Sequence, residues 1–147
     1  MTTKSDFTEQ EWELVLEGPT SAGMIVITAQ RGGTLRETVS MAKAYAEARQ
    51  HHGQSELLDG IVAAKPEIDH TRYGSLEEVK ERCLAHLRDA VALLDGKATP
   101  QELDEYKRLI VNLSDKVARA HRESGRGEKP VSDTERAATA AIVEALG

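Results

Sequence analysis

The chain has 147 residues, the length of one ordinary domain, and we expect a single domain over residues 1–147. Hydrophobic residues make up 39% of the chain, but one Trp, one Phe and three Tyr leave the core to aliphatic side chains, which favours packed helices. The net charge of −6 disfavours a nucleic-acid partner, because a phosphate backbone is repelled. A single cysteine and the lack of any long apolar stretch predict a cytoplasmic protein without a signal peptide or membrane partner.

Five segments begin with one pattern, Ser or Thr followed three residues later by Glu. This is the capping box, in which the hydroxyl accepts from the backbone N–H of the Glu, and the Glu accepts from the backbone N–H of the first residue. Each instance precedes apolar residues at helical spacing. The five pairs are Thr8 with Glu11, Thr34 with Glu37, Ser75 with Glu78, Thr99 with Glu102, and Ser132 with Glu135.

The first predicted helix covers residues 8–16 and turns Trp12, Val15 and Leu16 inward. A second is expected over residues 19–29, because Pro19 follows Gly18 and proline is well suited to the first position of a helix. Phe7 and Trp12 are expected to close one end of the molecule.

The stretch GMIVITAQRGGTLR, residues 23–36, has a second interpretation as a buried strand followed by a phosphate-binding loop. The dinucleotide fingerprint spaces its glycines apart, whereas Gly32 and Gly33 are adjacent and Ala29 stands where the first glycine belongs. A strand also needs a partner strand, and no second apolar run of that character follows. We therefore interpret residues 24–29 as the end of a helix.

The next predicted helix covers residues 34–50, with an inward face formed by Leu35, Val39, Ala42 and Ala46. Its start predicts a weak anion site, because free backbone amides at a helix N-terminus bind phosphate or sulfate. The residues of this site are Arg31, Gly33, Thr34 and Arg36. The alternative is a plain helix corner capped by its own threonine.

A short helix is expected from Ser55, and two long helices over 75–95 and 99–122. In the first long helix the residues predicted to share one apolar face are Leu76, Val79, Cys83, Leu87, Ala90 and Leu94. In the second they form a heptad seam of Leu103, Tyr106, Ile110, Leu113, Val117 and Ala120. The link GKAT between the long helices is short enough to make them antiparallel neighbours. A last helix over 132–146 is predicted to turn four apolar side chains inward: Ala138, Ile142, Val143 and Leu146. The fold class is therefore all-α, a single-domain bundle of five to seven helices built on the antiparallel pair.

Cys83 and His86 lie three residues apart on a predicted helix and form a weak candidate metal site, since helical metal ligands use such spacings. The alternative is a buried small residue beside a boundary histidine. No combination of a nucleophile, a base and an orienting third group is evident, and no cofactor is expected.

The layout from FTEQEW to the last helix resembles small uncharacterised all-helical bacterial proteins. The ending GEKPVSDTERAATAAIVEAL, about 20 residues, is faintly similar to the turn, serine and helix units of tellurite-resistance-type helical domains. In that family an acidic Asp-Gly turn precedes the serine and is linked to metal binding. Here Glu128, Lys129 and Pro130 occupy that place, so the resemblance does not imply a metal site.

These patterns predict a non-enzymatic helical binding or regulatory protein that self-associates or binds a protein partner. The alternative is a small-ligand or metal-binding protein, possibly an enzyme, with a pocket between its helices. The first hypothesis requires an apolar surface on an exposed helix face. The second requires a polar pocket between helices.

Overall fold

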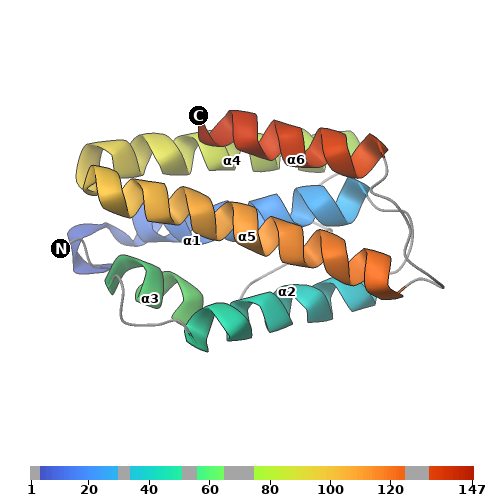
Figure 1. Ribbon diagram of the computed structural model, residues 1–147. Helices are drawn as coiled ribbons and strands as arrows, with labels where there is room; N and C mark the ends of the chain where they lie inside the picture. The colour runs from blue at the N-terminus through green and yellow to red at the C-terminus, as the bar shows by residue number, and fades with distance from the viewer. Residues whose placement is uncertain (1–3, 30–33, 51–55, 65–74, 125–132) are drawn as a thin grey trace.

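The computed structural model describes residues 4–29, 34–50, 56–64, 75–124 and 133–147. Over these ranges the chain is all-α, which confirms the predicted fold class (Figure 1). A short 3-10 helix, Lys4–Asp6, precedes six α-helices. They are α1 (Glu9–Ala29), α2 (Thr34–Gln50), α3 (Glu56–Ala63), α4 (Leu76–Lys97), α5 (Pro100–Ser124) and α6 (Asp133–Leu146).

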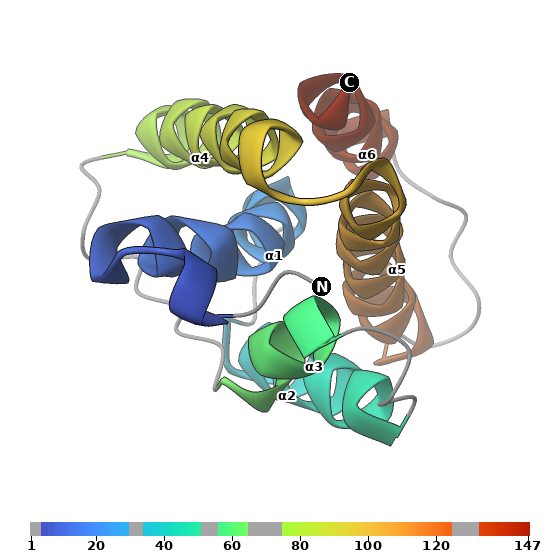
Figure 2. The same ribbon diagram turned by 90° about the vertical axis from the view of Figure 1, so that its left-hand side faces the viewer.

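The helices pack around one hydrophobic core, and α1 lies at its centre. Helix α1 contacts α4, α5 and α6, whereas α2 packs mainly on α5, and α3 on α2 and α5. Helices α4 and α5 are antiparallel, as predicted, and begin and end within two residues of the predicted bounds. They contact each other little, because α1 and α6 lie against both (Figure 2).

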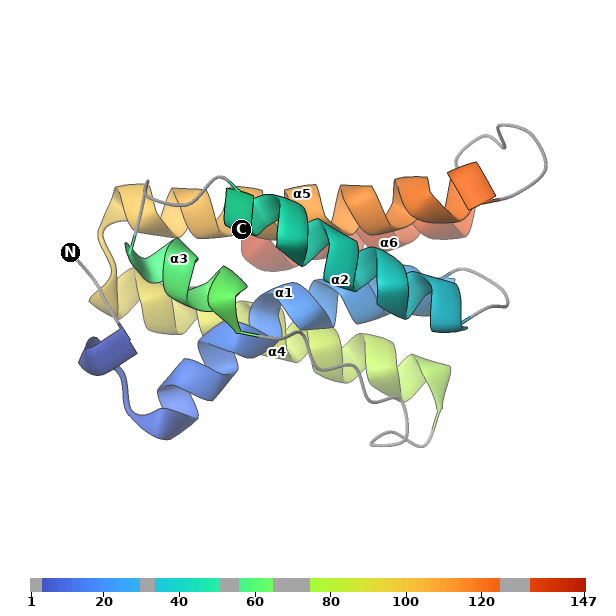
Figure 3. The same cartoon turned by 90° about the horizontal axis from the view of Figure 1, so that it is seen from below.

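Helix α1 is continuous, so the predicted break between residues 16 and 19 is wrong. Pro19 lies inside the helix and has no N–H to donate to the Val15 carbonyl oxygen. The buried Tyr106 hydroxyl of α5 donates to that oxygen instead, at 2.7 Å. Gly18 leaves the space for this contact, because a Cβ at Gly18 would overlap the Tyr106 hydroxyl. The helix bends rather than ends, as Figure 3 shows.

The Ser or Thr cap of three of the five predicted capping boxes can be seen, in two of them with the reciprocal Glu contact. Thr8 and Glu11 cap α1 reciprocally at 2.9 and 3.1 Å, and Thr99 and Glu102 cap α5 at 3.0 and 3.1 Å. The Ser75 hydroxyl accepts from the Glu78 N–H at 3.1 Å at the start of α4. The Thr34–Glu37 side chains and Ser132 lie outside what the structure describes.

Two predicted helix faces are confirmed and two need correction. The inward residues of α4 and α5 are buried wherever their side chains are described, except Leu103, which is half-buried. In α2, however, Ala42 and Ala46 are exposed, and the buried side chains are Met41, Ala44 and Tyr45. Met41 and Tyr45 remove far more apolar surface from water than two alanines, so they set the rotation of the helix.

In α6 the prediction fails at one residue. Ala138, Ile142 and Leu146 are buried, but Val143 is 51% exposed. Successive helix residues are turned by 100°, so Val143 cannot face the core together with its neighbour Ile142 and the nearby Ala145. Its side chain is therefore left on the outer surface of the bundle.

The N-terminal end is closed by Phe7 and Trp12, as predicted, with ring centroids 5.8 Å apart. Lys97, at the end of α4, stabilises this N-terminal end. Its Nζ atom donates to the Asp6 carbonyl at 3.1 Å and to Glu11 Oε1 at 2.7 Å. The same atom lies 5.5 Å from the centre of the Phe7 ring. Among the described residues, no helix combines the length and hydrophobicity needed to cross a membrane.

Candidate functional site

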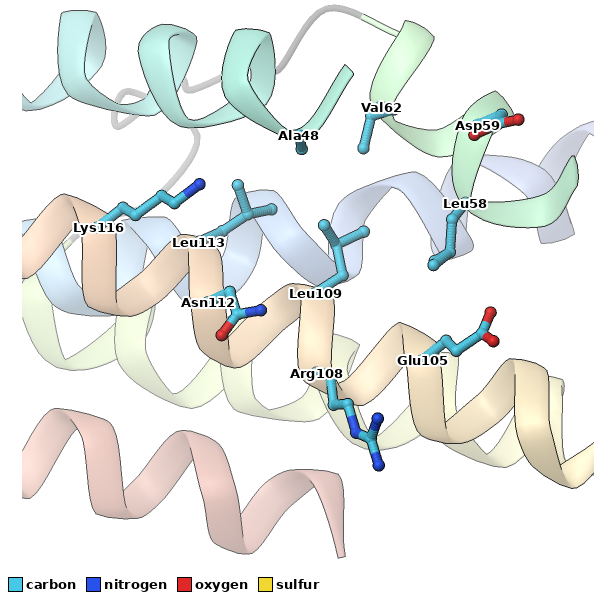
Figure 4. A pocket seen from close by; sticks show the side chains of 10 residues that line it. All are labelled: Ala48, Leu58, Asp59, Val62, Glu105, Arg108, Leu109, Asn112, Leu113 and Lys116. Atoms are coloured by element: carbon cyan, nitrogen blue, oxygen red, sulfur yellow. The ribbon is translucent and has the colours of Figure 1, made fainter. Parts of the chain in front are cut away.

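A groove of about 350 Å³ opens between α5 on one side and α2 and α3 on the other (Figure 4). Its size lies at the lower end of the range of small-molecule pockets. The lining residues are Ala48 of α2, Leu58, Asp59 and Val62 of α3, and Glu105, Arg108, Leu109, Asn112, Leu113 and Lys116 of α5. The groove therefore combines an apolar floor with charged residues.

Helix α3 forms one wall, and its sequence explains how. Leu57 and Ile61, four residues apart, are fully buried and anchor the helix in the core. Leu58 and Val62, the next residue in each case, are turned by 100° and line the groove. Arg49 at the end of α2 holds this wall, since its Nε donates to the Val62 carbonyl at 2.6 Å and its Nη2 to the Ala64 carbonyl at 3.4 Å.

Helix α5 forms the opposite wall in a similar way. Tyr106, Ile110 and Leu113 are buried, while Leu109 is half-buried and points toward α3 in Figure 4. Burial raises the pKa of Tyr106 well above its usual 10.0, with a smaller contribution from Tyr45, whose pKa is also raised by burial. Both tyrosines stay neutral at physiological pH, so neither adds charge to the core.

Of the four charged residues that line the groove, three lie at its ends, and Arg108 lies between Glu105 and Lys116 on α5. Asp59 and Glu105 lie at one end, and Lys116 lies at the other (Figure 4). Lys116 Nζ is 2.8 Å from Glu47 Oε2, and Arg108 Nη2 is 2.9 Å from Asp104 Oδ2, so both cations of the lining are paired. The Glu105 carboxylate accepts from the Gln101 amide at 3.3 Å and forms no ion pair with another described residue. The end at Asp59 and Glu105 therefore carries two carboxylates and is acidic.

The predicted metal site lies elsewhere, on α4. Cys83 is fully buried in the core, and His86 is half-buried between α4 and α1. The Nδ1 atom of His86 lies 3.5 Å from Ser21 Oγ and 3.8 Å from Glu17 Oε2. Within the described ranges, no group of three or more His, Cys, Asp or Glu side chains is arranged to hold a metal ion.

The cluster of Ser21, His86 and Glu17 has the residue types of a nucleophile relay but not its geometry. A relay needs the hydroxyl on one ring nitrogen and the carboxylate on the other. Here both approach the same nitrogen, and Ser21 is buried. The cluster instead supplies a polar contact between α1 and α4.

The predicted anion site is described only in part. Arg31 and Gly33 lie outside the described residues, and of Thr34 and Arg36 the structure gives the backbone alone, in the first turn of α2. The anion site thus stays a prediction.

Sequence reasoning missed the groove because its residues come from three helices and no local motif marks them. Leu109, for example, lies outside the heptad seam predicted for α5. A signal was present in SELLDGIVAAK, where Leu58 and Val62 form a second apolar pair beside Leu57 and Ile61. A helix that is apolar on two faces has more surface to cover than its core contact uses.

Comparison of the chain with protein-family models, with curated proteins and with solved structures found no match.

Proposed function

We propose that this is a non-enzymatic helical binding protein, with a regulatory role, that receives apolar side chains of a protein partner in the groove between α2, α3 and α5. The apolar floor of that groove carries the proposal. Leu58, Val62, Leu109 and Leu113 line it, and the Arg49 side chain donates to the Val62 carbonyl near the end of α3. Protein interfaces are centred on pockets of this kind, which one or two apolar anchors fill.

The dimensions favour side chains over a large ligand. A groove of about 350 Å³ is small for a cofactor, whereas one or two aliphatic side chains fit it. The surrounding charged residues form the polar rim that is typical of a partner surface. A cytoplasmic location belongs to the same proposal, because a chain with one cysteine suits a reducing compartment.

The proposal is tested by titrating the protein with isobutanol, which has the size and shape of an aliphatic side chain, and recording methyl NMR spectra. We expect saturable shifts of the Leu58, Val62, Leu109 and Leu113 methyl signals, because the probe removes its own apolar surface from water there. Leu109→Gln should weaken this binding about threefold or more.

Leu93 gives the matched control, since it is partly buried on α4 and does not line the groove. Leu93→Gln is expected to leave the isobutanol shifts unchanged. Shifts spread evenly over the protein surface, or an equal effect of the two variants, would contradict a binding role for the groove. Circular dichroism shows whether each variant remains helical.

A further inference from the structure

Helix α6 carries an outer face that its own bundle leaves uncovered. Val143 is the exposed large hydrophobic residue of the described part of the chain. On the same face lies Ala140, which is exposed and small, with the exposed Arg136 one turn closer to the start of the helix. The spacing from Arg136 to Ala140 to Val143 is four and three residues, which places these side chains in one row. These three residues, Arg136, Ala140 and Val143, are called the α6 face below.

The α6 face and the groove match in apolar character. The groove has a floor of aliphatic side chains that a small apolar side chain can contact, and Val143 is an exposed side chain of this kind. Ala140 carries only a methyl group, so the backbone of α6 beside it can approach the walls of the groove closely.

The two surfaces also match in charge, and only in one direction. The acidic end of the groove, at Asp59 and Glu105, is complementary to Arg136. Glu105 contributes most to this direction, because it forms no ion pair with another described residue. The reverse direction would set Arg136 against Lys116, and like charges in contact are unfavourable.

The lengths agree as well. At 1.5 Å per residue, Arg136 and Val143 are about 10 Å apart along α6, and Glu105 and Leu113 are about 12 Å apart along α5. The Arg136 side chain spans the difference. A helix running alongside α5 in the same direction therefore brings Arg136 to Glu105 when Val143 lies over Leu109 and Leu113.

We propose that the occupant of the groove is the α6 face of a second copy of this chain, docked parallel to α5 and held by Val143 and Arg136. The inference rests on the proposed function of the groove and names its partner. Because every copy carries both surfaces, the protein self-associates without another component.

The test is analytical ultracentrifugation of the full chain over a range of concentrations. We expect concentration-dependent association of the wild-type protein. Val143→Asp should weaken it about tenfold or more, because a carboxylate would enter an apolar floor. Since Val143 is exposed, this variant should unfold at the same denaturant concentration as the wild type.

A charge exchange tests the direction of docking. Glu105→Arg and Arg136→Glu should each weaken association, and the double variant should restore it, since the pair is then attractive again with its signs reversed. Glu81→Arg is the control, because Glu81 is exposed on α4 and belongs to neither surface. It should leave association unchanged.

A monomer at every concentration, or a double variant no stronger than the two single ones, would overturn the inference. That outcome differs from failure of the groove itself: a monomer whose groove methyl signals still shift with isobutanol keeps the proposed function and loses only this partner. If the groove binds no isobutanol, the proposed function itself is contradicted, whatever the oligomeric state.

Discussion

At the scale of single residues, the contact among Gly18, Pro19, Val15 and Tyr106 determines whether α1 is one helix or two. Proline in a helix interior normally costs about 3 kcal/mol, partly because the carbonyl four residues earlier loses its donor. Tyr106 replaces that donor from another helix, and the glycine beside the proline makes room for it. The three features are useful only together, so their removal should be non-additive.

We expect Tyr106→Phe to destabilise the protein by about 1–3 kcal/mol, because the buried Val15 carbonyl loses its hydroxyl donor. Gly18→Ala should cost a similar amount of about 1–3 kcal/mol by pushing the tyrosine away. In the Tyr106→Phe background the same alanine should cost less, since the hydroxyl it would overlap is gone. Urea unfolding of the four proteins measures these differences.

Gly96 is the control for this cycle. It lies within α4, and a Cβ there would meet no other atom within 4 Å. Gly96→Ala should therefore stabilise the protein by about 0.5–1 kcal/mol through helix propensity alone. Equal costs for alanine at Gly18 in both backgrounds would show that the tyrosine hydroxyl is not what Gly18 accommodates.

At the scale of the elements, the capping boxes explain why the bounds of α4 and α5 could be predicted from the sequence. A cap is local: Thr99 and Glu102 are three residues apart and satisfy each other whatever the remaining chain does. We expect Thr99→Ala to lower the free energy of unfolding by about 1 kcal/mol and Thr99→Asp to retain most of it. The urea unfolding midpoints of the two variants test this. Equal midpoints for Thr99→Ala and Thr99→Asp would count against a capping role for Thr99.

Features set by tertiary contacts could not be predicted in the same way. The continuity of α1 depends on Tyr106, 91 residues away from Val15 in sequence. The rotation of α2 depends on which residues fill the core, and its alanines fit the helical period as well as Met41 and Tyr45 do. The groove depends on how α3 and α5 are spaced, which no local pattern records.

At the scale of the whole molecule, Lys97 joins the N-terminal end to the corner between α4 and α5. Its hydrogen bond, followed by the backbone contact to Thr8, holds the pKa of Glu11 below its ordinary value of 4.5. A carboxyl whose pKa is lower in the folded protein stabilises the fold above its unfolded pKa, and this stabilisation is lost as the pH falls through the folded value. The contact thus predicts a specific part of the acid sensitivity of the protein.

We expect thermal stability to be nearly constant in this respect above about pH 5.5 and to fall below the ordinary pKa of Glu11, as the carboxylate is protonated. In Glu11→Gln, which keeps the size of the side chain and lacks the titration, the fall below the ordinary pKa of Glu11 should be shallower than in the wild type. Glu81→Gln, at an exposed position on α4, should follow the wild-type curve.

If Glu11→Gln loses stability with acid as steeply as the wild type, the Lys97 contact does not govern the acid part of the stability curve. Glu11 also caps α1, so Glu11→Gln changes the cap as well as the titration. Lys97→Met separates the two effects, because it removes the cation and leaves the cap. This variant should flatten the same part of the curve.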